Sequence, residues 1–167
     1  MKGDTDMNRV YAPQRVYSDS ISNEMVTAIY SGENFSGFLT ASGELFTFGD
    51  NSDGQLGIGI NQSNLFEPRR VVCDEKIVQA SLGNQHMLLL TQLGRVLGAG
   101  RNKEYQLGLK AYDGQPEHGS WVPVRIDSIR DVDVIKVVAG GFSAPLIQNS
   151  YERQLLVWGQ GDFGTFE

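Results

Sequence analysis

The sequence predicts an all-β protein whose strands form an incomplete β-propeller arc of about three blades. The chain repeats itself at intervals of 51 to 59 residues, and each repeat contains about four β-like runs bounded by Gly, Asn and Asp. Because no segment shows a sustained 3.6-residue period of apolar residues, little helix is expected. Four-stranded units repeated at this spacing are typical of propeller blades.

The two strongest repeats align without a gap over residues 32–57 and 83–108. Their glycines, and an element that ends in Gln-Leu-Gly, recur at a constant offset of 51 residues. The aligned pairs are Gly32 and Gly83, Gly43 and Gly94, Gly49 and Gly100, Gln55 and Gln106, Leu56 and Leu107, and Gly57 and Gly108. Because glycine adopts positive φ easily, these positions are predicted to be structural turn residues between strands.

A third, weaker repeat follows, in which Gly140 corresponds to Gly83 and Gly159 to Gly100. Residues 159–164 also read Gly-x-Gly-x-x-Gly, the pattern of a dinucleotide-binding turn. That site needs a following helix whose N-terminus binds the pyrophosphate, and three residues are too few for one. We therefore interpret these glycines as turn residues, and Trp158 as a blade side chain at the position of Phe48.

Three prolines, Pro13, Pro68 and Pro123, are spaced 55 residues apart, and each leads a β-like run. They give the predicted organisation of one domain. Residues 1–12 form an N-terminal tail, 13–67 the first repeat, 68–122 the second, and 123–167 a truncated third.

These motifs resemble the regulator of chromosome condensation repeat over most of the chain, from about Pro13 to Phe166. The family's Gly-Gln-Leu-Gly element is complete at residues 54–57, begins with Tyr105 in the second copy and has decayed in the third. The family's repeat histidine is present only as His86, with Phe35 and Ser143 at the other two positions. The resemblance implies a propeller of seven blades, of which about three are here, and a structural, hydrogen-bonding role for His86.

The amino-acid composition of the chain disfavours several classes of function. The 167 residues are 40% hydrophobic, with a net charge of −6 and one cysteine, Cys73. The acidic balance disfavours a nucleic-acid surface, and no stretch is long and apolar enough for a membrane span. With no secretory or transit signal in the sequence, we expect an intracellular, cytoplasmic protein that neither binds nucleic acid nor inserts into a membrane.

The sequence lacks the residue sets that catalysis or metal binding requires. His86, His118 and Cys73 are too few and too far apart for a zinc site, and Cys73 has no base in a triad-like pattern. Residues 50–54 begin like a calcium loop, but its twelfth position is Asn61 rather than Glu. We therefore expect no enzyme activity, no cofactor and no metal.

The loops over residues 58–67 and 109–121 differ most between repeats and follow the Gln-Leu-Gly turns, so they should share one rim of the arc. The candidate partner-binding residues in them are Asn61, Phe66, Tyr112, His118 and Trp121. Packing against the parent blade is the alternative for Phe66 and Trp121.

An open arc leaves sheet edges or faces bare, so we expect other protein chains, or copies of this one, to cover them. The predicted function is a non-catalytic protein-interaction or scaffold module, a stabilising subunit of a larger complex. Two alternatives stay open: a guanine nucleotide exchange factor for a small GTPase, which the resemblance implies, and a fragment of a larger propeller-containing regulatory protein.

Overall fold

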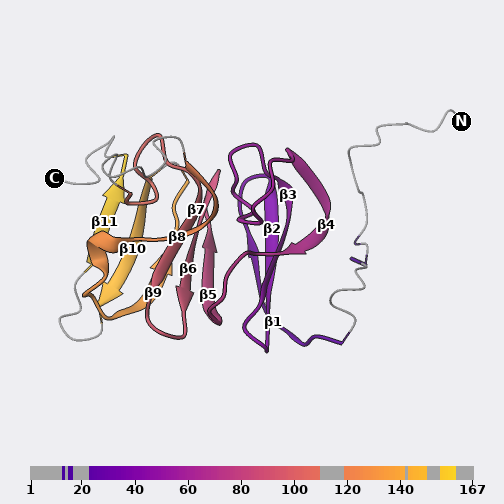
Figure 1. Cartoon of the computed structure of the whole chain (residues 1–167), viewed down its shortest axis with the longest axis horizontal. Coiled ribbons are helices and arrows are strands. Elements are labelled where there is room, and N and C mark those ends of the chain that lie inside the picture. The colour runs from indigo at the N-terminus through magenta and orange to yellow at the C-terminus, as the bar shows by residue number, and fades with distance from the viewer. Residues whose placement is uncertain are drawn as a thin grey trace, which may run out of the picture.

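The computed structural model describes residues 13, 15–16, 23–109, 119–141, 143–149 and 155–160. These residues form three antiparallel sheets, blades 1 to 3, which lie side by side in chain order (Figure 1). Blade 1 contains β1 (Val26–Ser31), β2 (Phe35–Thr40), β3 (Leu45–Asp50) and β4 (Asn64–Arg70). Blade 2 contains β5 (Ile77–Leu82), β6 (His86–Thr91), β7 (Val96–Arg101) and β8 (Gly119–Arg125). Blade 3 contains β9 (Val134–Val138), β10 (Ser143–Asn149) and β11 (Leu155–Gly159).

Each blade is a meander in which consecutive strands pair. The first strands contact one another in turn, β1 with β5 and β5 with β9, so they line the same side of the arc. A short 3-10 helix, η2 (Asp127–Ile129), connects β8 to β9. The nearly all-β architecture confirms the predicted fold class.

The repeated glycines close the turns as their chemistry requires. Gly43 and Gly94 lie in the turns β2–β3 and β6–β7 with φ of 86° and 72°, a region that other residues rarely adopt. Tyr105 stands where the first repeat has Gly54, and it takes a φ of 58° there. The turn geometry is therefore kept even where the glycine is lost.

The prolines do not begin the blades. Pro68 and Pro123 lie inside β4 and β8, the last strands of blades 1 and 2, so a repeat counted from proline to proline spans parts of two sheets. The β-like run expected after Pro13 is wrong for the residues described there, because Pro13, Arg15 and Val16 are not in a strand. In blades 1 and 2 the strand that contains the proline, β4 or β8, pairs with the third strand of the same blade, β3 or β7.

The apolar core lies between the blades. All six residues of β6, the second strand of the middle blade, are buried, because successive side chains point to opposite faces of the sheet. Met87 and Leu89 pack towards blade 1, whereas Leu88 and Leu90 pack towards blade 3. The middle blade therefore has two apolar faces, and each is covered by a neighbouring blade.

Candidate protein-interaction surfaces

The junction between blades 1 and 2 shows how one blade packs on the next. We call the side of a blade that packs against the blade before it the preceding face, and the opposite side the following face. Phe35, Leu39 and Leu45 on the following face of blade 1 pack against the preceding face of blade 2. That preceding face consists of Ile77, Ala80, Leu82, Met87, Leu89 and Ala99.

The junction between blades 2 and 3 repeats this arrangement and adds polar contacts. Its apolar cluster joins Leu88, Leu90, Val96 and Ile126 to Val134 and Val137 of β9. The Gln79 side chain accepts a hydrogen bond from Val137 N at 3.0 Å and donates one to Val137 O at 3.1 Å. Ser81 Oγ accepts from Ala139 N at 2.8 Å. The middle blade thus binds the backbone of the next blade's first strand.

Two sequence-predicted positions, Gly83 and Trp158, lie at this second junction. A Cβ at Gly83 would lie 2.6 Å from the carbonyl oxygen of Gly140, and one at Gly32 would lie 2.5 Å from that of Gly83. Glycine is required at these two positions because the backbone of the next blade approaches so closely. Trp158 lies against Gly108, and its indole N–H donates to Gln106 O at 3.1 Å.

Three positions that are buried at the internal junctions are exposed on the two end faces of the arc, although Phe38 and Phe46 on the preceding face of blade 1 are only 7% and 3% exposed. On the preceding face of blade 1, Val26 and Ile29 are 46% and 82% exposed, whereas their counterparts in blade 2, Ile77 and Ala80, are each 3% exposed. On the following face of blade 3, Leu155 is 64% exposed. Its counterparts Leu45 and Val96 are 1% and 3% exposed. Val26, Ile29 and Leu155 were not among the candidate residues, and aligning each strand with the next repeat is the signal that finds them.

The turns that run from Asn51 to Gly57 and from Asn102 to Gly108 hold the rim loops in place. Asn51 donates two hydrogen bonds of 3.0 Å to Ile60 O and Gln62 O, and its Oδ1 accepts from Leu56 N. Asn102 makes the corresponding contacts with Leu109 O and Leu107 N in blade 2. These buried amides fix the turn, so they serve the scaffold rather than a ligand.

The structure brings only some of the predicted rim residues together. Gly59 N donates to Trp121 O at 2.8 Å, so the loop that contains Asn61 does adjoin the start of β8. Asn61 is exposed, but Trp121 is half-buried against Gly54 of the blade 1 turn. Phe66 is 91% exposed on β4. Tyr112 and His118 lie outside the described residues.

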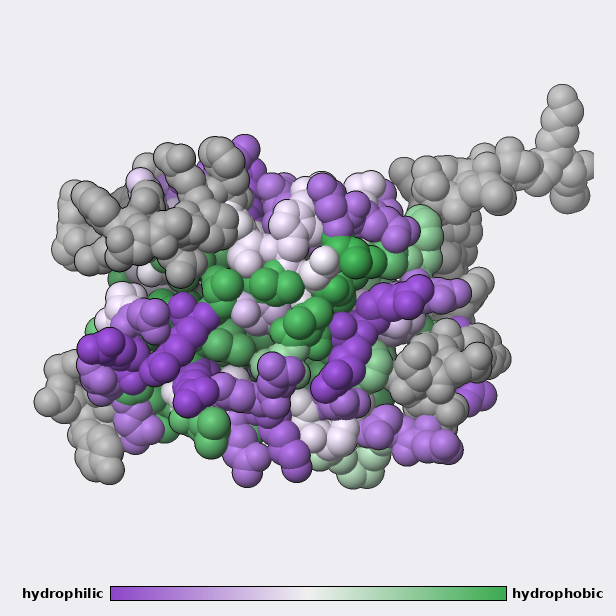
Figure 2. Space-filling view, in the orientation of Figure 1, coloured by the Kyte–Doolittle hydropathy of each residue, from purple (hydrophilic) through white to green (hydrophobic). Residues whose placement is uncertain are grey.

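Apolar side chains also gather on the face seen in Figure 2. They cluster in the middle of that view, where blades 1 and 2 adjoin, and hydrophilic side chains flank them. In the described part of the chain, no helix is long and apolar enough to cross a membrane.

His86 is fully buried on β6, yet neither ring nitrogen has a hydrogen-bond partner among the described residues. The described residues therefore do not supply the hydrogen bond that the resemblance implied. The ring occupies the slot left by Gly83, whose Cβ would lie 2.4 Å from His86 Cε1, and burial lowers the pKa of His86 to about 4. Phe35 occupies the matching slot in blade 1, where a Cβ at Gly32 would lie 2.3 Å from its ring. The site holds an aromatic ring, whether or not it carries nitrogen.

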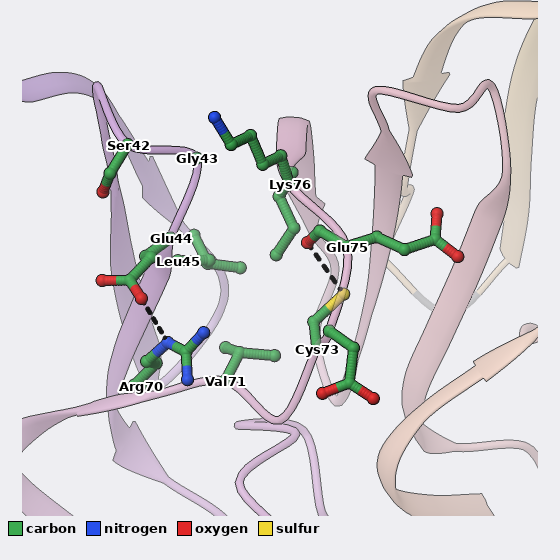
Figure 3. A pocket seen from close by; sticks show the side chains of 11 residues that line it. Ser42, Gly43, Glu44, Leu45, Arg70, Val71, Cys73, Glu75 and Lys76 are labelled. Carbon is green, nitrogen blue, oxygen red and sulfur yellow. Dashed lines mark hydrogen bonds and ion pairs between the residues drawn. The ribbon is translucent and has the colours of Figure 1, made fainter.

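A hollow of about 200 Å³ lies where the chain passes from blade 1 to blade 2 (Figure 3). Cys73 lines it and donates a hydrogen bond to Glu75 O at 3.3 Å. Burial raises the pKa of the Cys73 thiol, so it stays protonated and is a weak nucleophile at neutral pH. The Glu75 carboxylate points away from the sulfur and binds Arg95, while Glu44 pairs with Arg70 at 2.7 Å. These lining residues include no base placed to activate Cys73, and no cluster of three metal-ligating side chains occurs among the described residues.

Comparisons with known proteins agree with this geometry. The family model for the regulator of chromosome condensation (RCC1) repeat matches residues 42–90 and 94–144, and a second model for that repeat matches residues 26–55. The chain is 33% identical, over 84% of its length, to 8% of a bifunctional serine/threonine-protein kinase/NEDD4-like E3 ubiquitin-protein ligase of Dictyostelium discoideum. It is also 33% identical, over 75% of its length, to 30% of the mouse regulator of chromosome condensation.

Solved propeller structures show the same fold. The structure of human WBSCR16 gives a TM-score of 0.74 at 25% identity, over 90% of this chain and 38% of that one. Yeast RCC1 (Prp20) bound to Kap60 gives a TM-score of 0.71 at 24% identity, over 81% of this chain and 32% of that one. The chain therefore spans well under half the length of each relative named here.

Proposed function

The chain belongs to the regulator of chromosome condensation (RCC1) repeat family, and from that premise we propose that it is a non-catalytic protein-interaction module. It is an arc of blades that takes its place in a larger assembly through its two end faces. The observation that carries this proposal is the exposure of Val26, Ile29 and Leu155 at positions that are buried wherever two blades meet.

Burial of these side chains provides the driving force for docking. A large aliphatic side chain that moves from water into a packed interface contributes about 1.5–3 kcal/mol. Ile29 and Leu155 are each more than half exposed, so each retains most of that contribution for a partner. Exposed apolar side chains grouped on one surface are typical of protein interfaces.

The internal junctions define what such a partner must present. It needs a sheet face with aliphatic side chains at the spacing of Leu45 and Leu39, which pair across β3 and β2. It also needs a backbone close enough to meet the glycine that follows each first strand, as Gly83 meets Gly140. A blade of the same repeat type fulfils both requirements, and it can be supplied by another protein chain in the complex.

The experiment is site-specific photo-cross-linking in cells of the organism that produces this protein. A photoreactive side chain placed at Ile29 or at Leu155 should cross-link to strand residues of a propeller blade. Leu93, which is 66% exposed in the β6–β7 turn, is the matched control because it has the exposure of Leu155 but lies on neither end face. Equal cross-linking from Leu93, or none from the end faces, would overturn the proposal.

Guanine nucleotide exchange gives a second way to contradict the proposal. The assay follows the release of labelled GDP from a panel of small GTPases with and without the chain. We expect no acceleration, because the proposal assigns the function of the chain to its apolar end faces. Accelerated release that survives Ile29→Asp and Leu155→Asp would show a function carried elsewhere on the arc.

A further inference from the structure

The outer side of the arc carries a further candidate surface, where the last strand of blade 1 adjoins the last strand of blade 2. We call Ile60, Val72 and Val122 on this side the outer seam. We propose that the outer seam binds a linear acidic segment of a partner protein. An apolar side chain of the segment packs on the outer seam, and a neighbouring carboxylate pairs with Arg69. Because blades 1 and 2 form this surface together, it is separate from the end faces and goes beyond the proposed function.

The three residues of the outer seam come together where the loop of blade 1 reaches blade 2. Gly59 N donates a hydrogen bond to Trp121 O at 2.8 Å. A Cβ at Gly59 would lie 3.3 Å from Val122 Cγ1 and 3.5 Å from Val72 Cγ2, and Ile60 is the next residue. Although both blades are in place, Ile60 and Val72 are 46% and 51% exposed. Figure 2 shows apolar side chains gathered where these two blades adjoin.

The packing of the blades does not require an apolar residue at position 72. Val71 and Ile126 are equivalent buried residues, each of which donates its backbone N–H to the third strand of its own blade. The residue after Ile126 is Asp127, whose side chain is 72% exposed. The second repeat therefore has a charged residue where the first has Val72. The half-exposed Val72 side chain is thus available to a partner rather than needed by the fold.

Arg69 supplies a positive charge beside the outer seam. It is exposed on β4 and forms no ion pair among the described residues, whereas Arg70 pairs with Glu44 at 2.7 Å. Arg69 and Ile60 line one hollow of about 490 Å³. The other residues that line this hollow are Glu44, Phe46, Ile58, Pro68 and Arg70. The position of Arg69 is Val124 in blade 2, so the unpaired cation belongs to this surface alone among the two repeats.

These side chains define the chemistry of the ligand. A carboxylate can accept two parallel hydrogen bonds from the Arg69 guanidinium. A large apolar side chain gains free energy when it leaves water and covers the aliphatic side chains of the outer seam. The two groups must be close together in the ligand, because Arg69 and Ile60 line the same hollow. The whole chain has a net charge of −6, so the attraction for an acidic segment is local to Arg69 and should weaken with added salt.

The test is the selection of a displayed library of short random peptides on the full chain. We expect the enriched peptides to carry Asp or Glu close to a large apolar residue. Selection on Arg69→Glu should enrich Lys or Arg in place of the acidic residue, because the charge that the ligand meets is reversed. Arg130→Glu is the matched control, since it makes the same charge change at a side chain that is 64% exposed between β8 and β9. It should enrich the same acidic peptides as the wild type.

Fluorescence anisotropy of one enriched, labelled peptide then measures the contribution of each part of the surface. Arg69→Glu and Val72→Asp should each weaken binding by about tenfold, whereas Ile29→Asp on the end face should change it by less than about twofold. Val72→Asp introduces the residue that the second repeat has at Asp127, so the fold should tolerate it. Circular dichroism of each variant checks that it is folded.

Two results would overturn the inference: a selection that enriches no acidic peptides, and enriched peptides that bind Arg69→Glu as well as the wild type. Peptides whose binding is lost in Ile29→Asp but kept in Arg69→Glu would place the contact on an end face. That result would reject the outer seam and leave the proposed function standing. Peptide binding that depends on Arg69, together with end faces that cross-link to nothing, would reject the proposed function and keep the outer seam.

Discussion

Replacing His86 by phenylalanine should make the chain less sensitive to acid without disturbing its packing. His86 is fully buried, and its two ring nitrogens make no hydrogen bond with the described residues. Phe35 fills the equivalent slot in blade 1 at almost the same distance from its glycine. The first repeat of the chain therefore already has the phenylalanine that the variant His86→Phe would place in the second.

The magnitude follows from the pKa of His86. Burial lowers it from 6.5 to about 4, so the unfolded chain binds a proton in a pH range where the folded chain does not. Stability is fully present above about pH 6.5 and is lost as the pH falls towards 4. At about 1.4 kcal/mol for each pH unit of difference, the loss is about 2 kcal/mol at pH 5 and approaches about 3 kcal/mol near pH 4.

The assay is urea denaturation of wild type and His86→Phe at several values between pH 7 and pH 4. Every other titratable group is shared, so the difference between the two proteins isolates His86. The variant should be as stable as wild type or about 1 kcal/mol more stable at pH 7, because two buried unbonded nitrogens are removed. Its advantage should then grow by about 2 kcal/mol on going to pH 5. A difference that stays constant with pH would refute the reasoning.

Two further substitutions test the junctions. Gly83→Ala should destabilise the chain by about 1–3 kcal/mol, because its Cβ would lie 2.6 Å from the Gly140 carbonyl oxygen. Gly141→Ala is the control, because the atom nearest to its Cβ would be 3.4 Å away. It should change stability little in the same denaturation experiment. Gln79→Leu should cost about 2 kcal/mol and speed amide exchange at Val137, because both backbone groups of Val137 lose their side-chain partner. An unchanged exchange rate at Val137 would show that the Gln79 contact does not hold blade 3.

The repeats, and with them the fold class, were readable from the sequence because a turn that needs positive φ leaves glycines at fixed spacing. Gly43 and Gly94 show this directly. The limits of a blade were not readable in the same way, since a periodic sequence looks the same from any starting point. Only strand pairing shows that Pro68 belongs to the last strand of blade 1.

The candidate surfaces were harder to predict. Sequence reasoning looked for aromatic residues in variable loops and selected Trp121, which is half-buried against Gly54. In the sequence, Ile29 cannot be told from the other aliphatic residues of the predicted strands. Its significance depends on the burial of Ala80 in the next blade, which is a property of the assembled fold. In the same way, the missing hydrogen bond of His86 depends on which atoms line its slot.

A comparison of Ile29→Asp with Ala80→Asp tests most directly whether the exposed strand positions are packing sites that lack a partner blade. The two residues are equivalent in the repeat but are 82% and 3% exposed. Ile29→Asp should keep the free energy of unfolding within about 0.5 kcal/mol of wild type. Ala80→Asp should lose more than about 4 kcal/mol, because it buries an unpaired charge. Equal destabilisation by the two substitutions would contradict the role assigned to the end faces.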